Sequence, residues 1–318
     1  MQGKRSAYMS GCFSAEDDNQ SMSDKEKVPE QARSFEEWRR YHYETEKALI
    51  AKIMAMPAEA PERGRVFREA YDVIIRDIIQ KYNPGGGETC YSDVVVGIAK
   101  KLLAGNSRVL DIGCGSGETV FQFLRAGYSA WGIDVEDDCI CRARAKLALL
   151  NAESHVARTD VLDYATEESF DFLIMDNVIE HLLPDTVPTI LRRCFELLNP
   201  NGYLLVVTPH RFSGPHDISK YFLPLGAKAE GSHLQEYTFA DLSEMLQNAG
   251  FSHRAGFPFH PKLFRALHYF PRSSDWAARK SLCMEQLLKD RRILKLNRRL
   301  TQLMVALLFP AVCLGQKR

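Results

Sequence analysis

Short apolar runs alternate with amphipathic stretches along the middle of this 318-residue chain. The apolar runs have the length of buried strands and fall at residues 108–113, 129–135, 154–160, 170–176 and 202–209. Segments whose apolar residues have helical spacing lie between these runs or after them, at 118–125, 136–151, 187–198 and 238–250. Two further strands near 251–258 and 264–270 complete the pattern. It predicts an α/β protein with a seven-stranded, mainly parallel sheet covered by helices.

The two ends of the chain differ from this middle part. Residues 1–32 are polar and lack periodic apolar positions, which predicts a flexible tail. Helical spacing then predicts an N-terminal helical lid over 33–104, and a C-terminal helical extension over 273–318. The α/β domain therefore covers 105–272, and its polar and aromatic segment 210–237 is an insertion after the fifth strand.

Charge and composition exclude several classes of protein. The 41 basic side chains balance 41 acidic ones, which argues against a dedicated nucleic-acid-binding protein. No signal peptide and no apolar segment of membrane-spanning length stands in the sequence, so we expect a cytoplasmic protein. Basic residues precede an apolar run within 290–318, which suggests peripheral contact of that segment with an anionic membrane.

The run VLDIGCGSGE at 109–118 places three glycines at alternate positions directly after the first predicted strand. Such a turn lets a ligand approach the backbone and the N-terminus of the next helix. A dinucleotide fingerprint would have glycine where Glu118 stands, and the Gly-Lys-Ser/Thr ending of a phosphate loop is absent. A carboxylate at this position suits a cationic ligand better than a pyrophosphate.

The same run resembles the first motif of class I S-adenosylmethionine-dependent methyltransferases. GID at 132–134, the TD pair that ends at Asp160, and NVIEHL at 177–182 follow in the order and spacing of that family, and the resemblance covers about 107–257. It implies a Rossmann-like fold with S-adenosyl-L-methionine as cofactor. The segment HLQEYT in the insertion is similar to a bacterial subgroup associated with sugar and glycoconjugate modification.

The resemblance also implies roles for individual residues. The methionine end of the cofactor would be held by the glycine turn and its neighbours, which are Asp111, Gly113, Cys114, Gly115 and Gly117. Asp134, with Val135 beside it, would accept hydrogen bonds from the ribose hydroxyls, because two carboxylate oxygens suit a vicinal diol. Asp160 and Val161 would contact the adenine, and Asn177 would lie near the methionine carboxylate or the transferred methyl group.

Several histidines follow the ends of the predicted strands. Methyl transfer needs alignment above all, and a hydroxyl acceptor also benefits from a base within hydrogen-bond reach. The candidate catalytic residues on this edge of the sheet are His181, His210, His233 and Glu236, although each could instead be a structural, hydrogen-bonded side chain. We expect no metal site, because the spacing of His216, Asp217, His233 and Glu236 matches no metal-binding template.

Together these features predict methyl transfer to a small-molecule acceptor. The expected reaction is O-methylation of a hydroxylated metabolite, a sugar or a lipid-linked glycan. Two alternatives stay open: N- or C-methylation, and a catalytically inactive protein that binds the cofactor for a regulatory purpose.

Overall fold

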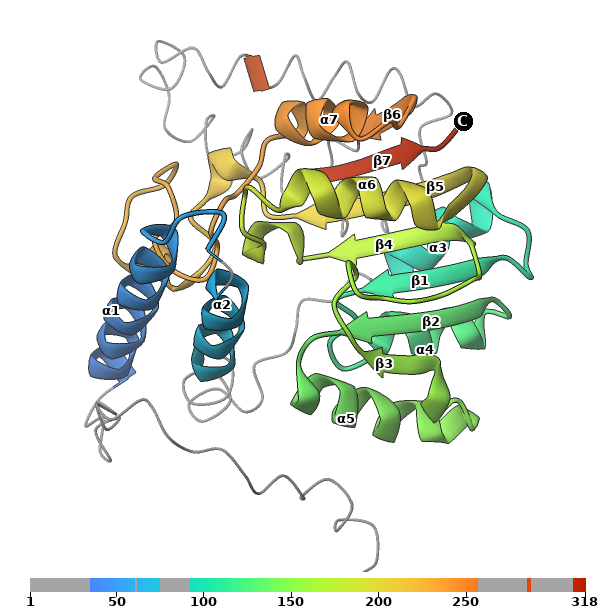
Figure 1. The fold of residues 1–318 in the computed structure, drawn as a ribbon, viewed down its shortest axis with the longest axis horizontal. Coiled ribbons are helices and arrows are strands. Elements are labelled where there is room, and N and C mark those ends of the chain that lie inside the picture. Colours follow the sequence, from blue (N-terminus) through green and yellow to red (C-terminus); the bar gives the residue numbers. More distant parts are fainter. Residues whose placement is uncertain (1–34, 61, 75–91, 257–284, 287–310) are drawn as a thin grey trace, which may run out of the picture.

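A single mixed sheet forms the centre of the molecule in the computed structural model, which describes residues 35–60, 62–74, 92–256, 285–286 and 311–318 (Figure 1). The strands are β1 (Arg108–Ile112), β2 (Ser129–Asp134), β3 (Val156–Arg158), β4 (Phe170–Asp176), β5 (Leu198–Thr208), β6 (His253–Gly256) and β7 (Ala311–Gln316). They lie in the order β3-β2-β1-β4-β5-β7-β6. Strands β1 to β5 pair in parallel, and β7 is antiparallel to both of its neighbours. The predicted α/β architecture is confirmed.

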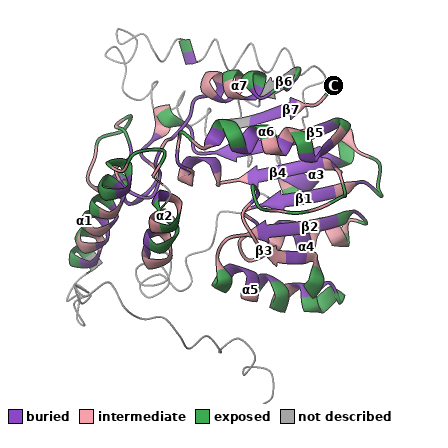
Figure 2. Ribbon diagram, in the orientation of Figure 1, coloured by how far each residue is buried: buried purple, intermediate pink, exposed green. Residues whose placement is uncertain are grey.

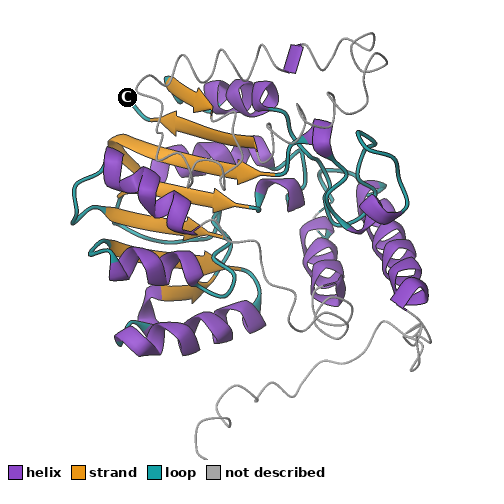
Figure 3. Ribbon diagram, turned by 180° about the vertical axis from the view of Figure 1, so that it is seen from behind, coloured by secondary structure: helices purple, strands orange, loops and turns teal. Residues whose placement is uncertain are grey.

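Helices cover both faces of this sheet (Figures 1 and 3). One face carries α3 (Ser92–Leu102), α4 (Glu118–Arg125) and α5 (Asp137–Leu147), and the other carries α6 (Val187–Leu197) and α7 (Phe239–Asn248). Successive strand residues point to opposite faces, so Val109 packs with the α4 side chains and Leu110 with those of α6 and α7. The strands are therefore buried on both faces (Figure 2), as their continuous apolar runs predict.

Helices α1 (Phe35–Met54) and α2 (Arg63–Asp72) lie beyond the carboxyl ends of the parallel strands (Figure 1). They share a small hydrophobic core with the loops after β4 and β5, made of Ile50, Ile53, Ala70, Leu183 and Leu234. The buried guanidinium of Arg63 also pairs with Asp185 in the loop after β4. Both helices fall within the predicted lid region, and these contacts fix them at the ligand edge of the sheet.

The C-terminal part of the chain corrects the predicted domain boundaries. Residues 311–316 were expected to belong to a helical extension, but they form β7, which lies between β5 and β6. Cys313 packs against one face of the sheet and Leu314 against the other, so this short apolar run behaves as a buried strand. The α/β domain therefore includes the end of the chain. The tail predicted at 1–32 and the strand predicted at 264–270 lie outside the described residues, as do 273–284 and 287–310 of the predicted helical extension.

Candidate functional site

A cavity opens at the carboxyl ends of β1, β2 and β4, next to α2. Its described lining contains several residues that the sequence predicts at the cofactor or the acceptor: Gly113, Asp134, Val135, Asp160, Val161, Asn177 and His181. Helix α2 contributes Phe67, Arg68 and Tyr71 to the same lining. The cavity thus lies where ligands bind in parallel α/β sheets.

The glycine turn after β1 brings the backbone against the end of β2. Gly113 has a φ of +74°, and its N–H donates to the carbonyl of Ile133 (2.8 Å). A Cβ at Gly113 would overlap the side chain of Val178, so this position needs glycine for both its dihedral angle and its space. Gly117 has a φ of +75° at the start of α4, where a Cβ would come within 2.9 Å of Ala143 Cβ.

Asp134, at the end of β2, is held by two backbone groups. The N–H of Gly115 donates to its Oδ2 (2.8 Å), and the N–H of Glu136 donates to its Oδ1 (3.0 Å). Together these bonds fix the plane of a carboxylate that lines the cavity. A fixed carboxylate here can accept hydrogen bonds from the hydroxyls of a bound sugar ring.

Two further loops complete this side of the cavity. Asn177 follows β4 with a φ of +56°, a left-handed conformation that asparagine tolerates better than most residues. Its backbone N–H donates to the carbonyl oxygen of Val207 (2.8 Å), and this bond connects the loop to β5. Asp160 accepts from the N–H of Leu162 (2.9 Å), and this turn places the buried side chain of Val161 at the cavity.

Two other predicted cofactor residues, Asp111 and Cys114, are buried next to the glycine turn. Asp111 is buried inside β1. The Cys114 thiol is buried against Gly132, where a Cβ would come 2.8 Å from the Cys114 Sγ, and this burial raises the pKa of the thiol. The described lining of the cavity includes neither of these residues, nor Gly115 or Gly117. Direct contact of these four residues with a ligand stays a prediction.

Among the histidines that the structure describes, His181 lines the cavity. A carbonyl can only accept, so the 3.0 Å contact between His181 Nδ1 and the carbonyl of Ser232 places the ring proton on Nδ1. Burial lowers the pKa of His181 to about 3, and the neighbouring His233 adds to this effect. The ring is therefore neutral near pH 7, with a lone pair on Nε2. Tyr71 and His233 contact it edge-on, with ring centroids 5.4 and 4.8 Å away.

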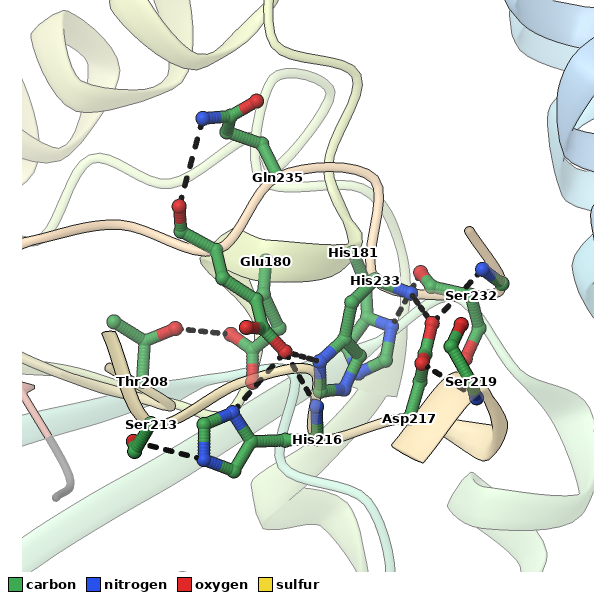
Figure 4. Close-up of polar contacts among 12 residues, drawn as sticks. Glu180, His181, Thr208, Ser213, His216, Asp217, Ser219, Ser232, His233 and Gln235 are labelled. Carbon is green, nitrogen blue, oxygen red and sulfur yellow. Dashed lines mark hydrogen bonds and ion pairs between the residues drawn. The ribbon is translucent and has the colours of Figure 1, made fainter. Parts of the chain in front are cut away.

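In the insertion, the buried carboxylate of Glu236 contacts the rings of two histidines, His216 and His233, which are labelled in Figure 4. Glu236 Oε1 accepts from His233 Nδ1 (2.9 Å) and from the backbone N–H of His216 (2.8 Å). Burial would raise the pKa of Glu236, but the hydrogen bonds from His216 and His233 outweigh it and lower the pKa to about 2. For His233, burial would lower the pKa, but the bond to Glu236 and the field of Glu180 raise it. Glu236 is thus an ionised group that orients His233.

Glu180 is a fully buried carboxyl group beside these histidines (Figure 4). Its Oε2 accepts from the Thr208 hydroxyl (2.9 Å), and burial raises its pKa to about 7. Ligand-type atoms of Glu180, His181 and His233 lie within 4.8 Å of one another, a spacing that a divalent cation could bridge. The sequence spacing did not predict this set. Asp217, which it did consider, instead accepts hydrogen bonds from backbone N–H groups of the insertion.

Comparison with known proteins agrees with this arrangement. A family model described as a methyltransferase domain matches residues 35–255, which is more than half of the chain. The chain belongs to this methyltransferase family. The match includes the glycine turn, Asp134 and the His181 loop, and it extends to α1 and α2.

Curated relatives of this methyltransferase are O-methyltransferases. It is 29% identical over 200 residues to the ubiquinone biosynthesis O-methyltransferase of Ralstonia nicotianae, covering 60% of this chain and 78% of that protein. It is 38% identical over 109 residues to the protein of the same name from Rhodopseudomonas palustris, covering 33% of this chain. That match covers 40% of the relative, so the chain spans less than half the length of this relative.

Solved structures with the same fold include N-methyltransferases. The 1,6-didemethyltoxoflavin-N1-methyltransferase of Burkholderia thailandensis, solved with S-adenosylhomocysteine, has a TM-score of 0.50 at 18% identity, covering 82% of this chain and 92% of that one. A phosphoethanolamine N-methyltransferase of Haemonchus contortus has a TM-score of 0.51 at 15% identity, and the match covers 79% of this chain and 60% of that one. These likenesses show the shared fold alone, and the fold does not select the atom that is methylated.

In this methyltransferase the structure places His210 away from the cavity. Its side chain is 1% exposed, its Nε2 contacts Glu285 Oε1 (2.8 Å), and its Nδ1 accepts from the N–H of Phe212 (3.2 Å). Glu285 also accepts from backbone N–H groups at the start of α7. Of the two roles open to His210, catalytic or structural, these contacts favour the structural one: the described lining of the cavity does not include His210, and its ring faces a carboxylate 75 residues further along the chain.

The sequence did not single out some residues that the structure brings to the site. Arg68 and Glu136 line the cavity, and burial together with a hydrogen bond to Asp72 of α2 and the charge of that residue raises the pKa of Glu136 to about 8. In the helix, Arg68 directly follows Phe67 and lies about one turn before Tyr71, but nothing in the sequence says which face of α2 meets the sheet. Glu180 stands next to His181 in NVIEHL, and its burial was not visible in that motif.

Proposed function

We propose that this chain binds S-adenosyl-L-methionine in the cavity and methylates an oxygen of a small hydroxylated molecule. One observation carries the proposal: His181, neutral and with a lone pair on Nε2, lines the same cavity as Asp134 and Asn177. The names of the curated relatives support oxygen as the acceptor atom.

The residues at the cavity fit this cofactor. The fixed carboxylate of Asp134 would accept from both ribose hydroxyls, and Asp160 with Val161 would hold the adenine. Gly113 and Asn177 would hold the methionine end, and we expect the sulfur to face His181, which lines the same cavity. When bound, the cofactor supplies a methyl group that its positively charged sulfur activates. The protein has to align the acceptor oxygen with that methyl carbon and accept one proton.

His181 would receive the hydrogen bond of the acceptor hydroxyl on Nε2. A buried imidazole with a pKa of about 3 is a weak base by itself, so the proton would be shared with the neighbouring groups. Glu180, which has a pKa of about 7, is the member of the cluster that best accepts a proton near neutral pH. In the proposed transfer the acceptor oxygen would bond to the methyl carbon as the carbon–sulfur bond breaks, and the sulfonium would become a neutral thioether.

This weak base favours an acidic acceptor. A phenol has a pKa near 10, far below that of a sugar hydroxyl, and so needs less help to lose its proton. Phe67 and Tyr71 of α2 give the cavity an aromatic wall on which a ring can pack. We therefore propose a hydroxylated aromatic compound as the acceptor, in preference to a sugar or glycan.

Transfer of a labelled methyl group to a panel of phenols, catechols and sugars tests the proposal. We expect transfer to a hydroxylated aromatic compound, and a loss of kcat of about 100-fold in His181→Ala with unchanged affinity for S-adenosylhomocysteine. His155→Gln is the control, because His155 precedes β3 at the opposite end of that strand from the cavity. Full activity of the His181 variant would favour N-methylation. Cofactor binding without transfer to any acceptor would favour the regulatory alternative.

A second candidate is the same reaction assisted by a divalent cation. The observation that favours it is the close approach of Glu180, His181 and His233. Such a cation would lower the pKa of the acceptor hydroxyl directly. Loss of activity in a chelator, with recovery on adding zinc or magnesium and no recovery in His233→Ala, would establish it. Activity that persists after complete metal removal would leave the proton-accepting cluster as the mechanism.

We also propose a cytoplasmic location with peripheral membrane contact. None of the helices in the part of the chain that the structure describes is long and apolar enough to cross a membrane. Because 311–316 belong to the sheet, the segment available for contact shortens to 290–310, whose sequence has basic residues before an apolar run. Co-sedimentation with anionic vesicles that persists after replacing Arg291, Arg292, Arg298 and Arg299 by glutamine would contradict this contact.

A further inference from the structure

Helix α1 carries a buried carboxylate that the proposed reaction does not use directly. Glu46 is 1% exposed, although ionisable groups are rarely buried without partners. Its Oε2 accepts from the backbone N–H of Ser232 in the insertion (2.8 Å), and its Oε1 accepts from Nε2 of His42 (2.5 Å). The carboxylate therefore connects the N-terminal helix with a loop 186 residues away.

The loop that Glu46 holds is the loop that sets the state of His181. The carbonyl of Ser232 accepts the Nδ1 proton of His181 (3.0 Å), while the N–H of the same residue donates to Glu46. Ser232 is thus fixed from both sides, by a carboxylate on one side and by the imidazole on the other.

The rest of this loop is held in the same manner. Asp217 Oδ2 accepts from the N–H groups of Gly231 (2.9 Å) and His233 (3.3 Å). Two carboxylates thus bind three consecutive N–H groups, those of Gly231, Ser232 and His233. Gly231 leaves room for this arrangement, since a Cβ there would overlap Glu46 Oε2 and lie 2.8 Å from Asp217 Oδ2.

We infer that Glu46 is a positioning residue for His181. This inference rests on the proposed function of His181 as the group that meets the acceptor hydroxyl. The proton of a neutral imidazole stays on the nitrogen whose hydrogen bond is stronger. By holding Ser232, Glu46 keeps a carbonyl at Nδ1 and so leaves Nε2 of this cavity-lining histidine unprotonated. Helix α1 is therefore part of the catalytic architecture, although none of its described residues lines the cavity.

The experiment replaces Glu46 and follows the proton on His181. Glu46→Ala removes the acceptor for Ser232, and Glu46→Gln keeps an oxygen that can accept from it. Glu44→Gln is the matched control, because Glu44 is an exposed glutamate on the same helix. Nitrogen-15 NMR of the full chain distinguishes a protonated ring nitrogen from an unprotonated one, and the spectrum of His181→Gln assigns the His181 signals.

We expect wild type, Glu46→Gln and Glu44→Gln to carry the His181 proton on Nδ1, and Glu46→Ala to move part of it to Nε2. The same variant should lose kcat by about 10- to 100-fold, as is typical of residues that orient a functional histidine. KM for the cofactor should not change, and Glu46→Gln should restore most of the rate. Gly231→Ala disturbs the same loop through a residue of the loop itself, because the added Cβ would overlap Glu46 Oε2. This variant should also move part of the His181 proton to Nε2.

The NMR result separates this inference from the proposed function. If no acceptor is ever methylated, the position of the proton in wild type and Glu46→Ala is still measured. An unchanged Nδ1 proton in both Glu46→Ala and Gly231→Ala would overturn the inference. If Glu46→Ala does not fold, the same NMR measurement on Gly231→Ala decides the question, with Glu46→Gln as the variant expected to match wild type. An unchanged Nδ1 proton in Gly231→Ala would then overturn the inference.

Discussion

Asp134 combines a structural and a ligand-binding role in one carboxylate. It holds the glycine turn through Gly115 and the next turn through Glu136, and it lines the cavity. A residue of this kind can be predicted from sequence, because its partners lie at most 19 residues away and follow from the strand–turn–helix pattern.

Replacing Asp134 by alanine should weaken cofactor binding strongly. The variant loses the hydrogen bonds to the ribose and frees two backbone groups that shape the turn. Hydrogen bonds to a charged group contribute about 1.5–3 kcal/mol, which corresponds to a loss of about 10- to 100-fold in affinity. Calorimetric titration with S-adenosylhomocysteine measures this affinity. The control is Asp163→Asn, because Asp163 is exposed. Unchanged affinity in Asp134→Ala would remove this residue from the site.

His210 should matter for stability and not for the chemistry. Its buried ring bonds to Glu285, which in turn binds the first N–H groups of α7. His210→Ala would leave part of that buried carboxylate without a partner, and we expect a loss of about 1–3 kcal/mol in the free energy of unfolding. Urea denaturation and kcat measured on folded protein test this. A loss of kcat without a loss of stability would return His210 to the active site.

Residues whose partners are distant in sequence could not be predicted. His210 is a catalytic candidate in the sequence because it follows a predicted strand, but its ring contacts Glu285, which stands 75 positions later. Glu118 suggests a cationic ligand in the sequence, yet its carboxylate pairs with Lys146 of α5 (2.7 Å), and hydrogen bonds from Gln122 and Lys146 lower its pKa. Such contacts depend on the packing of whole helices, which a local pattern does not contain.

At the scale of elements, the insertion is a loop organised by buried carboxyl groups. Asp217 binds its backbone, Glu236 joins His216 to His233, and Glu46 attaches it to α1. The sequence indicated that 210–237 contains acceptor-site residues, but it could not indicate that most of them bind one another.

This organisation predicts a loss of stability in acid. The pKa of Glu236 is lowered to about 2, below its ordinary value of about 4.5, so the folded state binds this proton less readily than the unfolded chain. Its contribution is complete above about pH 4.5 and is lost as the pH falls toward 2, and it amounts to at most about 3 kcal/mol. We expect the free energy of unfolding to fall less between pH 5 and pH 3 in Glu236→Gln than in wild type, as measured by denaturation at the two pH values. Equal differences would contradict the ionised state of Glu236.

Strand β7 predicts that the end of the chain is essential for folding. It pairs along β5 and β6, and its Cys313 is fully buried. Truncation after residue 310 would expose the side of β5 and leave β6 without its partner, so we expect loss of cooperative unfolding in a thermal melt. Removal of Arg318 alone is the control. A truncated protein that melts like the full chain would show that β7 is dispensable.

On the scale of the whole molecule, one edge of the sheet gathers every part of the site. The α/β sheet and the glycine turn could be predicted, because strands that alternate with helices are typical of a parallel sheet with ligands at its carboxyl edge. The position of the last strand could not, since a short apolar run near the C-terminus suits a helix or a strand equally well. Helices α1 and α2 and the insertion then close the edge that the sheet provides.

The structure of this chain with S-adenosylhomocysteine bound is the most direct test of the whole account. The ribose hydroxyls should lie within hydrogen-bond distance of Asp134, and the adenine beside Asp160 and Val161. The sulfur should point toward His181, with space for an aromatic acceptor between it, Phe67 and Tyr71. A ligand bound elsewhere, or bound with its sulfur directed away from His181, would contradict the proposed function.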